Sequence, residues 1–286
     1  MSERNLKRTL IGLLGPAFAL VCGLFVPALA ILLLVSTFNF AGGRYQTDVT
    51  FQAYRGFFGD PFYYHIIGQS FLVGITCTAI CLLLGYPTAY ALTKIRRPYL
   101  LLISYVLVFS PLLTSIVVRA YGWLVLLSDS GITNWVLLRL HIVDSPVRLI
   151  FNFTGVVLGL VHFLLPFTVF PILSVLVRLD PALREAAADL GANRVQTFLH
   201  VTAKLSFPGV FAATQLTFLL AINAFVTPQL LGGGRVVVLP QQIYQNITVL
   251  NVPMAAVQSL FLIALTCAIA AASNFLFSRT RLSSLG

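Results

Sequence analysis

Six stretches of about 20 or more predominantly apolar residues recur along this chain, and they constrain its fold more than any other feature. Each is long enough to cross a hydrocarbon core about 30 Å thick as a helix. A β-barrel would instead show short segments that alternate between apolar and polar residues. We therefore expect an all-α integral membrane protein with six transmembrane helices. The expected spans run over about 9–38, 65–93, 99–127, 150–177, 205–227 and 254–277.

Composition agrees with this class, because 58% of the 286 residues are hydrophobic and only 9% are charged. Soluble domains carry about 25% charged residues. The first apolar run follows a basic N-terminus as a secretion signal would, but it continues to Phe38, so we expect an uncleaved span. All four cysteines fall inside expected spans, so we expect neither disulfides nor metal ligation: Cys22, Cys77, Cys81 and Cys267.

The basic residues predict the orientation. With the N-terminus inside, twelve of the 18 Lys and Arg residues lie on inner segments and six on outer segments or within a span. Since inner loops are enriched in Lys and Arg, both termini should be cytoplasmic. The net charge of +10 is then explained by topology, and nucleic-acid binding is not expected.

The longest inner connection, residues 180–204, contains a polar and Ala-rich segment. Asp180 can cap a first helix that starts with Pro181, and Gly191 can end it in a left-handed conformation. Asn193 and Gln196 have the spacing of a capping box for a second helix. Small apolar residues at helical spacing would form one face of the first helix, namely Leu183, Ala186, Ala187 and Leu190. From the pattern alone, this face could either contact a partner protein or lie on lipid headgroups.

The run "EAAADLGANRVQTFLHV", Glu185 to Val201, resembles the EAA loop of the membrane subunits of binding-protein-dependent ABC importers. The stretches "VRAYGWLVLLSDSGITNWVL" and "AFVTPQLLGGG" resemble the spermidine/putrescine branch of these permeases. One departure is Ala203-Lys204, where the family has Leu-Pro, which leaves Pro208 to supply a helix break.

The resemblance implies a type I importer permease fold in the bacterial inner membrane, in contact with membrane lipid. It implies that residues 180–204, which we call the coupling loop, dock on a cytoplasmic ABC ATPase dimer, with contact residues Arg184, Glu185, Ala186, Ala187, Asp189, Leu190 and Gly191. A soluble substrate-binding protein and a second permease subunit, more often a homologue than an identical copy, complete such systems.

The chain lacks the chemistry of an energy-converting enzyme. It has no GxxxxGK[ST] phosphate cradle, so ATP and Mg²⁺ are expected on partner subunits and no cofactor on this chain. The alternative is a secondary transporter driven by an ion gradient, which should carry intramembrane Asp or Glu and often an inverted repeat. We find neither. His162, the one histidine deep in a span, is interpreted as a hydrogen-bonded structural residue in preference to a proton relay.

Candidate pathway or gate residues are the polar and aromatic side chains at membrane depth or beside the outer motif: Arg119, Tyr121, Asn223, Thr227 and Gln258. Arg119 is the most informative, because a charge inside a span needs a partner and no carboxylate lies in any expected span. Helix carbonyls, a sister subunit or a substrate anion could be that partner, and the alternative is snorkelling to the outer headgroups. Ala224 and Gln229 stand where the family has acids, so a small zwitterionic or anionic solute is favoured over a polyamine.

Overall fold

The computed structural model describes residues 3–41 and 44–283, without the side chains of 3–14, 17, 41, 44–48 and 279–283. The basic residues near both termini that support the predicted orientation have side chains outside this description. The chain divides into two units, Met1–Tyr63 with Gln242–Leu265, and Tyr64–Gln241 with Thr266–Gly286.

The first unit contains α1 (Glu3–Ser36), a two-stranded antiparallel hairpin of β1 (Phe38–Ala41) and β2 (Arg44–Val49), and α2 (Gln52–Gly59). It also holds most of α12 (Leu239–Thr248) and the first part of α13 (Val252–Ser283). Its core is aromatic, with the buried Phe57 ring 5.2 Å from that of Phe261. The hairpin departs from the all-α prediction and lies in the polar connection after the first span.

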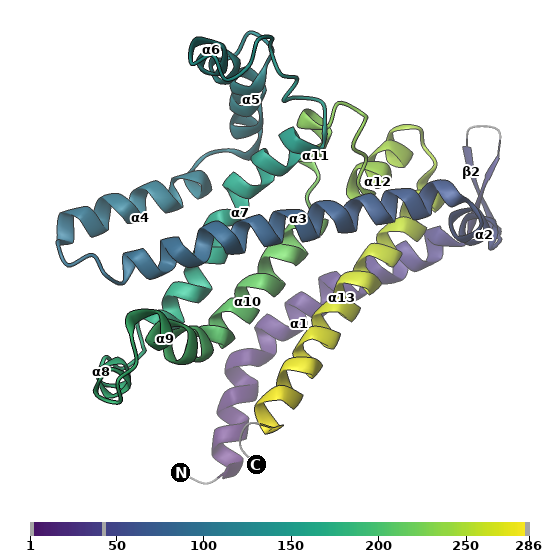
Figure 1. The fold of residues 1–286 in the computed structure, drawn as a ribbon. Helices are drawn as coiled ribbons and strands as arrows, with labels where there is room; N and C mark the ends of the chain where they lie inside the picture. The colour runs from purple at the N-terminus through teal and green to yellow at the C-terminus, as the bar shows by residue number, and fades with distance from the viewer. Residues whose placement is uncertain (1–2, 42–43, 284–286) are drawn as a thin grey trace. The chain divides into compact units, whose positions relative to one another are not determined.

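The second unit is built around α7 (Phe153–Leu176), the most buried helix, which lies beside α10 (Ala203–Ile222) (Figure 1). Its other elements are α3 (Pro61–Leu92), α4 (Pro98–Leu113), α5 (Ile116–Leu127), α6 (Ile132–Arg139), α8 (Ala182–Asp189), α9 (Arg194–Thr197), the π-helical turn η1 (Phe198–Thr202) and α11 (Val226–Leu231). The segment with α5 and α11 lies at the N-terminal end of α7, and α8 and α9 lie at its C-terminal end (Figure 1).

Small residues allow α7 and α10 to approach closely. A Cβ on Gly209 would lie 2.9 Å from the Pro171 carbonyl oxygen, so only glycine fits there. The hydroxyls of Thr168 and Thr217 hydrogen-bond across the same interface at 2.8 Å. Small side chains and interhelical hydrogen bonds are typical of helix packing in membranes, where no hydrophobic effect drives helices together.

Five helices among the described residues are long and apolar enough to cross a membrane. A sixth crossing is obtained if Pro98–Leu113 and Ile116–Arg139, which are bent by 102° relative to each other, count as one span. The expected span 99–127, which Ser110-Pro111 interrupts in the sequence, is therefore built from two helices and not one. Pro111 lacks an N–H and leaves the Leu107 carbonyl without its helical donor, and the Ser110 hydroxyl donates to that carbonyl at 3.0 Å.

The fifth span also differs from its prediction at both ends. The helix begins at Arg194, before the expected 205, and continues through η1 into α10 without a break at Pro208. It ends at Ile222, so Thr227 lies in the separate helix α11 and not in the span. The remaining expected spans agree with α1, α3, α7 and α13 to within a few residues at most ends, as is usual for helix boundaries.

Candidate functional site

The coupling loop has the local geometry that its sequence predicts. Asp180 Oδ1 accepts a hydrogen bond from the Ala182 N–H at 2.9 Å and so caps α8. Gly191 has φ +82°, and the N–H groups of Gly191 and Ala192 donate to the carbonyls of Ala188 and Ala187 at 2.9 and 3.0 Å. These two bonds form a Schellman motif, which satisfies the last carbonyls of the helix.

The second helix of the loop begins with the predicted capping box. Asn193 Oδ1 accepts from the Gln196 N–H, and Gln196 Oε1 accepts from the Asn193 N–H, both at 2.9 Å. The helix then widens into η1, immediately before Ala203-Lys204, where the Ala203 N–H donates to the Phe198 carbonyl. The π-turn directly precedes Ala203-Lys204, the position at which the family has Leu-Pro. A π-bulge can bend a helix without proline, so this turn can replace the proline.

The two sides of α8 have different surroundings. None of its eight residues is buried, and Leu183 and Leu190 are 46% and 89% exposed. Glu185 and Asp189 are also exposed. A hollow of about 370 Å³ beside Leu190 extends along the corner, lined by Ala187, Leu190, Gly191, Ala192, Gln196, Thr197, His200 and Val201. The exposed apolar face of α8 lies next to this hollow, which is at the corner between α8 and α9. A partner protein can cover such a surface.

Arg184 points in a different direction from the exposed leucines. Its guanidinium carbon is 6.0 Å from the centre of the Tyr90 ring on α3. It therefore faces α3, whereas we expected it among the residues that contact the ATPase.

Arg119 is only 7% exposed, and its partners come from two other helices. Its Nη1 donates to the Pro111 carbonyl in the last turn of α4, and its guanidinium lies 4.5 Å from the centre of the Phe163 ring on α7. The last carbonyls of a helix lack intrahelical donors and carry the negative end of the helix dipole, so a cation is favourable there. A helix carbonyl, one of the expected partners, is confirmed.

His162 lies beside this cluster and accepts a hydrogen bond at Nδ1 from the Trp123 indole N–H at 3.2 Å. The rings meet edge to face at 5.6 Å. This is the hydrogen-bonded structural setting that we expected for the histidine.

The other pathway candidates each have their own surroundings. Thr227 is buried and its methyl group packs on Gly159, whereas Tyr121 is 56% exposed. Asn223 is exposed at the end of α10 and donates to the Leu219 carbonyl at 2.8 Å. In the other unit, Gln258 is fully buried and accepts from the Asn246 side chain at 2.9 Å, while its Nε2 has no hydrogen-bond partner among the described residues.

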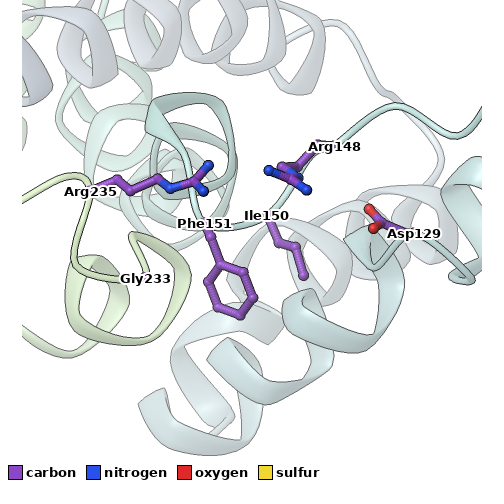
Figure 2. Close-up of a pocket in the computed structure, with 6 residues that line it drawn as sticks. All are labelled: Asp129, Arg148, Ile150, Phe151, Gly233 and Arg235. Carbon is purple, nitrogen blue, oxygen red and sulfur yellow. The ribbon is translucent and has the colours of Figure 1, made fainter.

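A pocket of about 410 Å³ lies at the N-terminal end of α7, and we call it the double-arginine pocket. Figure 2 shows the guanidinium groups of Arg148 and Arg235 directed toward each other above Phe151, with Asp129 on the far side of Arg148. Phe151 has φ +56°, and a Cβ on Gly233 would lie 2.5 Å from its ring. The pocket thus combines two facing cations, a helix N-terminus and a strained backbone at Phe151. Such an arrangement is suited to an anionic group.

Comparisons with known proteins identify the family. The chain is 35% identical over 217 residues to the spermidine/putrescine transport system permease PotB of Haemophilus influenzae, covering 76% of this chain and 75% of that protein. It is 38% identical over 176 residues to PotB of Escherichia coli, covering 62% and 64%, so the match spans less than two thirds of that relative. The inner membrane ABC transporter permease YdcU of Escherichia coli is 30% identical over 222 residues, covering 73% and 70%. No family model matches the chain. This chain belongs to the ABC transporter permeases.

Solved structures agree on the fold of the permease. A chain of the bacterial alginate ABC transporter, in complex with a periplasmic protein bound to alginate pentasaccharide, has a TM-score of 0.77 at 18% identity and covers 97% of each chain. A chain of an amino acid ABC transporter has a TM-score of 0.56 at 14% identity. The predicted importer permease fold is confirmed.

Several residues that line these pockets were missed by sequence reasoning because their partners are distant in the chain. Tyr90, on α3, contacts Arg184 and Phe198 of the coupling loop, which begins about 90 residues later, and Lys94 lines the same pocket. Arg148 and Arg235 were interpreted only as outer basic residues, although they face each other. Their local sequence carries no signal for either contact.

Asn134, another missed residue of the permease, fixes the segment that leads to the double-arginine pocket. Its buried side chain donates to the Ser128 and Val147 carbonyls, each at 3.0 Å, and accepts from the Val147 N–H at 2.8 Å. We expect Asn134→Ala to lower the free energy of unfolding by about 2–4 kcal/mol, because it leaves three backbone groups without partners. Thermal unfolding in detergent measures this loss. The exposed Asn223→Ala is the matched control, and equal melting temperatures for both variants would contradict the prediction.

Proposed function

We propose that the chain is the membrane-spanning permease subunit of an ATP-driven importer, which passes a small solute from a soluble binding protein across the bacterial inner membrane. A cytoplasmic ATPase dimer binds ATP and Mg²⁺ and docks on the coupling loop. The observation that carries this proposal is the exposed apolar face of α8 ending at the Gly191 corner, in a chain whose relatives are ABC permeases.

In this proposal closure of the ATPase dimer moves α8, and the motion passes to the membrane through the helix that runs from Arg194 to Ile222. That helix packs along α7, whose 24 residues span about 36 Å at 1.5 Å per residue. The coupling loop and the double-arginine pocket lie at opposite ends of α7 and so on opposite sides of a bilayer. Both termini are then cytoplasmic, on the side of the coupling loop, as the distribution of Lys and Arg indicates.

The experiment that tests the proposal is uptake by the complete complex in proteoliposomes, with ATP inside and no ion gradient, compared with an imposed proton or sodium gradient without ATP. We expect uptake only with ATP and the binding protein. Uptake driven by the gradient alone would favour the secondary transporter instead.

We also propose a homologous, non-identical second permease and a small zwitterionic or anionic substrate. The two PotB relatives are named spermidine/putrescine permeases, so a polyamine is the other candidate. No Asp or Glu lies within α3, α4, α5, α7 or α10 to attract a cation, and Arg119 is buried among them. Calorimetric titration of the cognate binding protein decides between the two, and tight binding of spermidine or putrescine with rejection of anions would contradict our preference.

The double-arginine pocket is proposed as a point where an acidic side chain of the binding protein docks. Arg148→Gln with Arg235→Gln should weaken binding of that protein to the complex in nanodiscs by at least about 100-fold, since each of the two charged hydrogen-bonding groups contributes about 1.5–3 kcal/mol. Surface plasmon resonance at two salt concentrations measures the effect. Arg139→Gln removes an exposed charge outside the pocket and should change affinity less than twofold. Equal affinities for both variants would exclude the pocket as the contact.

A further inference from the structure

A second basic pocket, of about 400 Å³, lies behind the coupling helix α8, on the side that faces α3. We call it the Tyr90 pocket. It is lined by Tyr90, Lys94, Arg184, Ala188, Ala192, Arg194, Thr197, Phe198 and Thr202. Its three cations come from three segments, the end of α3, α8 and α9, so the fold, and not one basic run of sequence, brings them together.

Two of these cations share one aromatic ring. The Lys94 Nζ lies 5.2 Å and the Arg184 guanidinium carbon 6.0 Å from the centre of the Tyr90 ring. Phe198, on η1, supports this ring in an edge-to-face contact at 5.3 Å. Cation–π contacts hold the two charges in place, but they do not neutralise them. Like charges gathered on one ring repel each other unless an anion lies between them.

Arg184 also has an unused hydrogen-bond donor. Its Nε is shielded from solvent and has no partner among the described residues. A shielded donor without an acceptor is unfavourable, and an arginine presents its donors as a planar fork that matches carboxylate and phosphate oxygens. None of the described residues that line the pocket is acidic. The acceptor must therefore come from another molecule.

We propose that the Tyr90 pocket binds a phosphate group, supplied by the headgroup of an anionic phospholipid of the cytoplasmic leaflet. Lys94 lies two residues beyond the end of the apolar helix α3, and Thr202 directly precedes α10, so the pocket lies at the depth of lipid headgroups. Basic pockets at the cytoplasmic ends of membrane helices are suited to anionic headgroups. Because Arg184 belongs to α8, the bound lipid would hold the coupling helix against α3.

The cytoplasmic placement rests on the proposed function, but lipid binding does not require transport, so the two can fail separately. The test uses the complex purified with its partner subunits and reconstituted in nanodiscs of phosphatidylcholine with a minor fraction of phosphatidylglycerol. Native mass spectrometry after detergent extraction counts the phosphatidylglycerol that remains bound. Lys94→Gln with Arg194→Gln should lower apparent affinity roughly 10- to 30-fold, since each cation that contacts the headgroup phosphate contributes about a factor of five.

The matched control is Arg96→Gln with Arg97→Gln, which removes the same charge beside Lys94 but outside the pocket lining. It should retain lipid to within about twofold of the parent. Equal retention by both double variants would overturn the proposal. The proposal would also be overturned if the parent retained the lipid only after the ATPase had been removed. In that case an acidic side chain of the ATPase fills the pocket in the complete complex.

A final arm separates lipid from free phosphate. Inorganic phosphate at millimolar concentration is added to the parent complex before extraction. A control sample receives chloride at the same ionic strength. If phosphate displaces phosphatidylglycerol and chloride does not, the pocket is a phosphate site that soluble anions can also enter. Persistence of the lipid under phosphate would support the headgroup as the specific ligand. Melting temperatures of all variants must stay close to the parent, which shows that lost lipid reflects lost binding.

Discussion

Gly191→Val is expected to reduce ATP-driven transport by at least about tenfold while leaving the permease inserted in the membrane. Gly191 has φ +82°, a conformation that a β-branched residue adopts only at a cost of about 1–3 kcal/mol. No described heavy atom lies within 4 Å of the position that a Cβ would occupy, so the effect is conformational and not a clash. Uptake and binding-protein-stimulated ATPase activity measure it.

One control isolates the corner itself. Gly191→Asn should retain most activity, because asparagine tolerates the left-handed conformation. Glu185→Lys, which reverses an exposed charge on α8, should add to the loss. Unchanged coupling in the Glu185→Lys, Gly191→Val double variant would contradict docking of the ATPase at this loop.

The coupling loop could be predicted in detail because local chemistry determines it. Asp180, Gly191 and the Asn193–Gln196 pair act through bonds to backbone groups no more than five residues away. The membrane spans were predictable for a related reason, since every backbone polar group in lipid must be satisfied within its own helix. The importer family was predictable from the same loop and was confirmed by the relatives.

What could not be predicted depends on side chains that meet across the fold. Pro111 signals a break but neither the bend of 102° nor the binding of its carbonyl by Arg119 from the next helix. The Tyr90 pocket and the double-arginine pocket each combine segments more than 80 residues apart. The π-turn at Phe198–Thr202 has no residue signature comparable to a glycine or proline.

Arg119→Gln is expected to lower the uptake rate by at least about tenfold and to destabilise the permease. It removes a cation from the C-terminal end of α4, where such a charge stabilises a helix by up to about 2 kcal/mol. It also removes a desolvated cation–π contact with the Phe163 ring, which contributes a similar free energy. Arg119→Lys retains the charge but loses the planar fork, so its rate should lie between those of the parent and Gln. Uptake kinetics and melting temperature are measured on the same preparations.

The position of Arg119 between α4 and α5 indicates a role beyond that of an anchor at the membrane surface. Arg119 joins the two halves of the broken span, because it lies on α5 and binds the last turn of α4. A substrate anion that draws the guanidinium away would release that carbonyl and loosen the bend, which makes Arg119 a candidate gate. Phe163→Leu, which removes the ring but no charge, should weaken the same gate less than Gln does. If the Lys and Gln variants both transport at the parental rate and affinity, the bend does not depend on Arg119 and the residue has no part in the pathway.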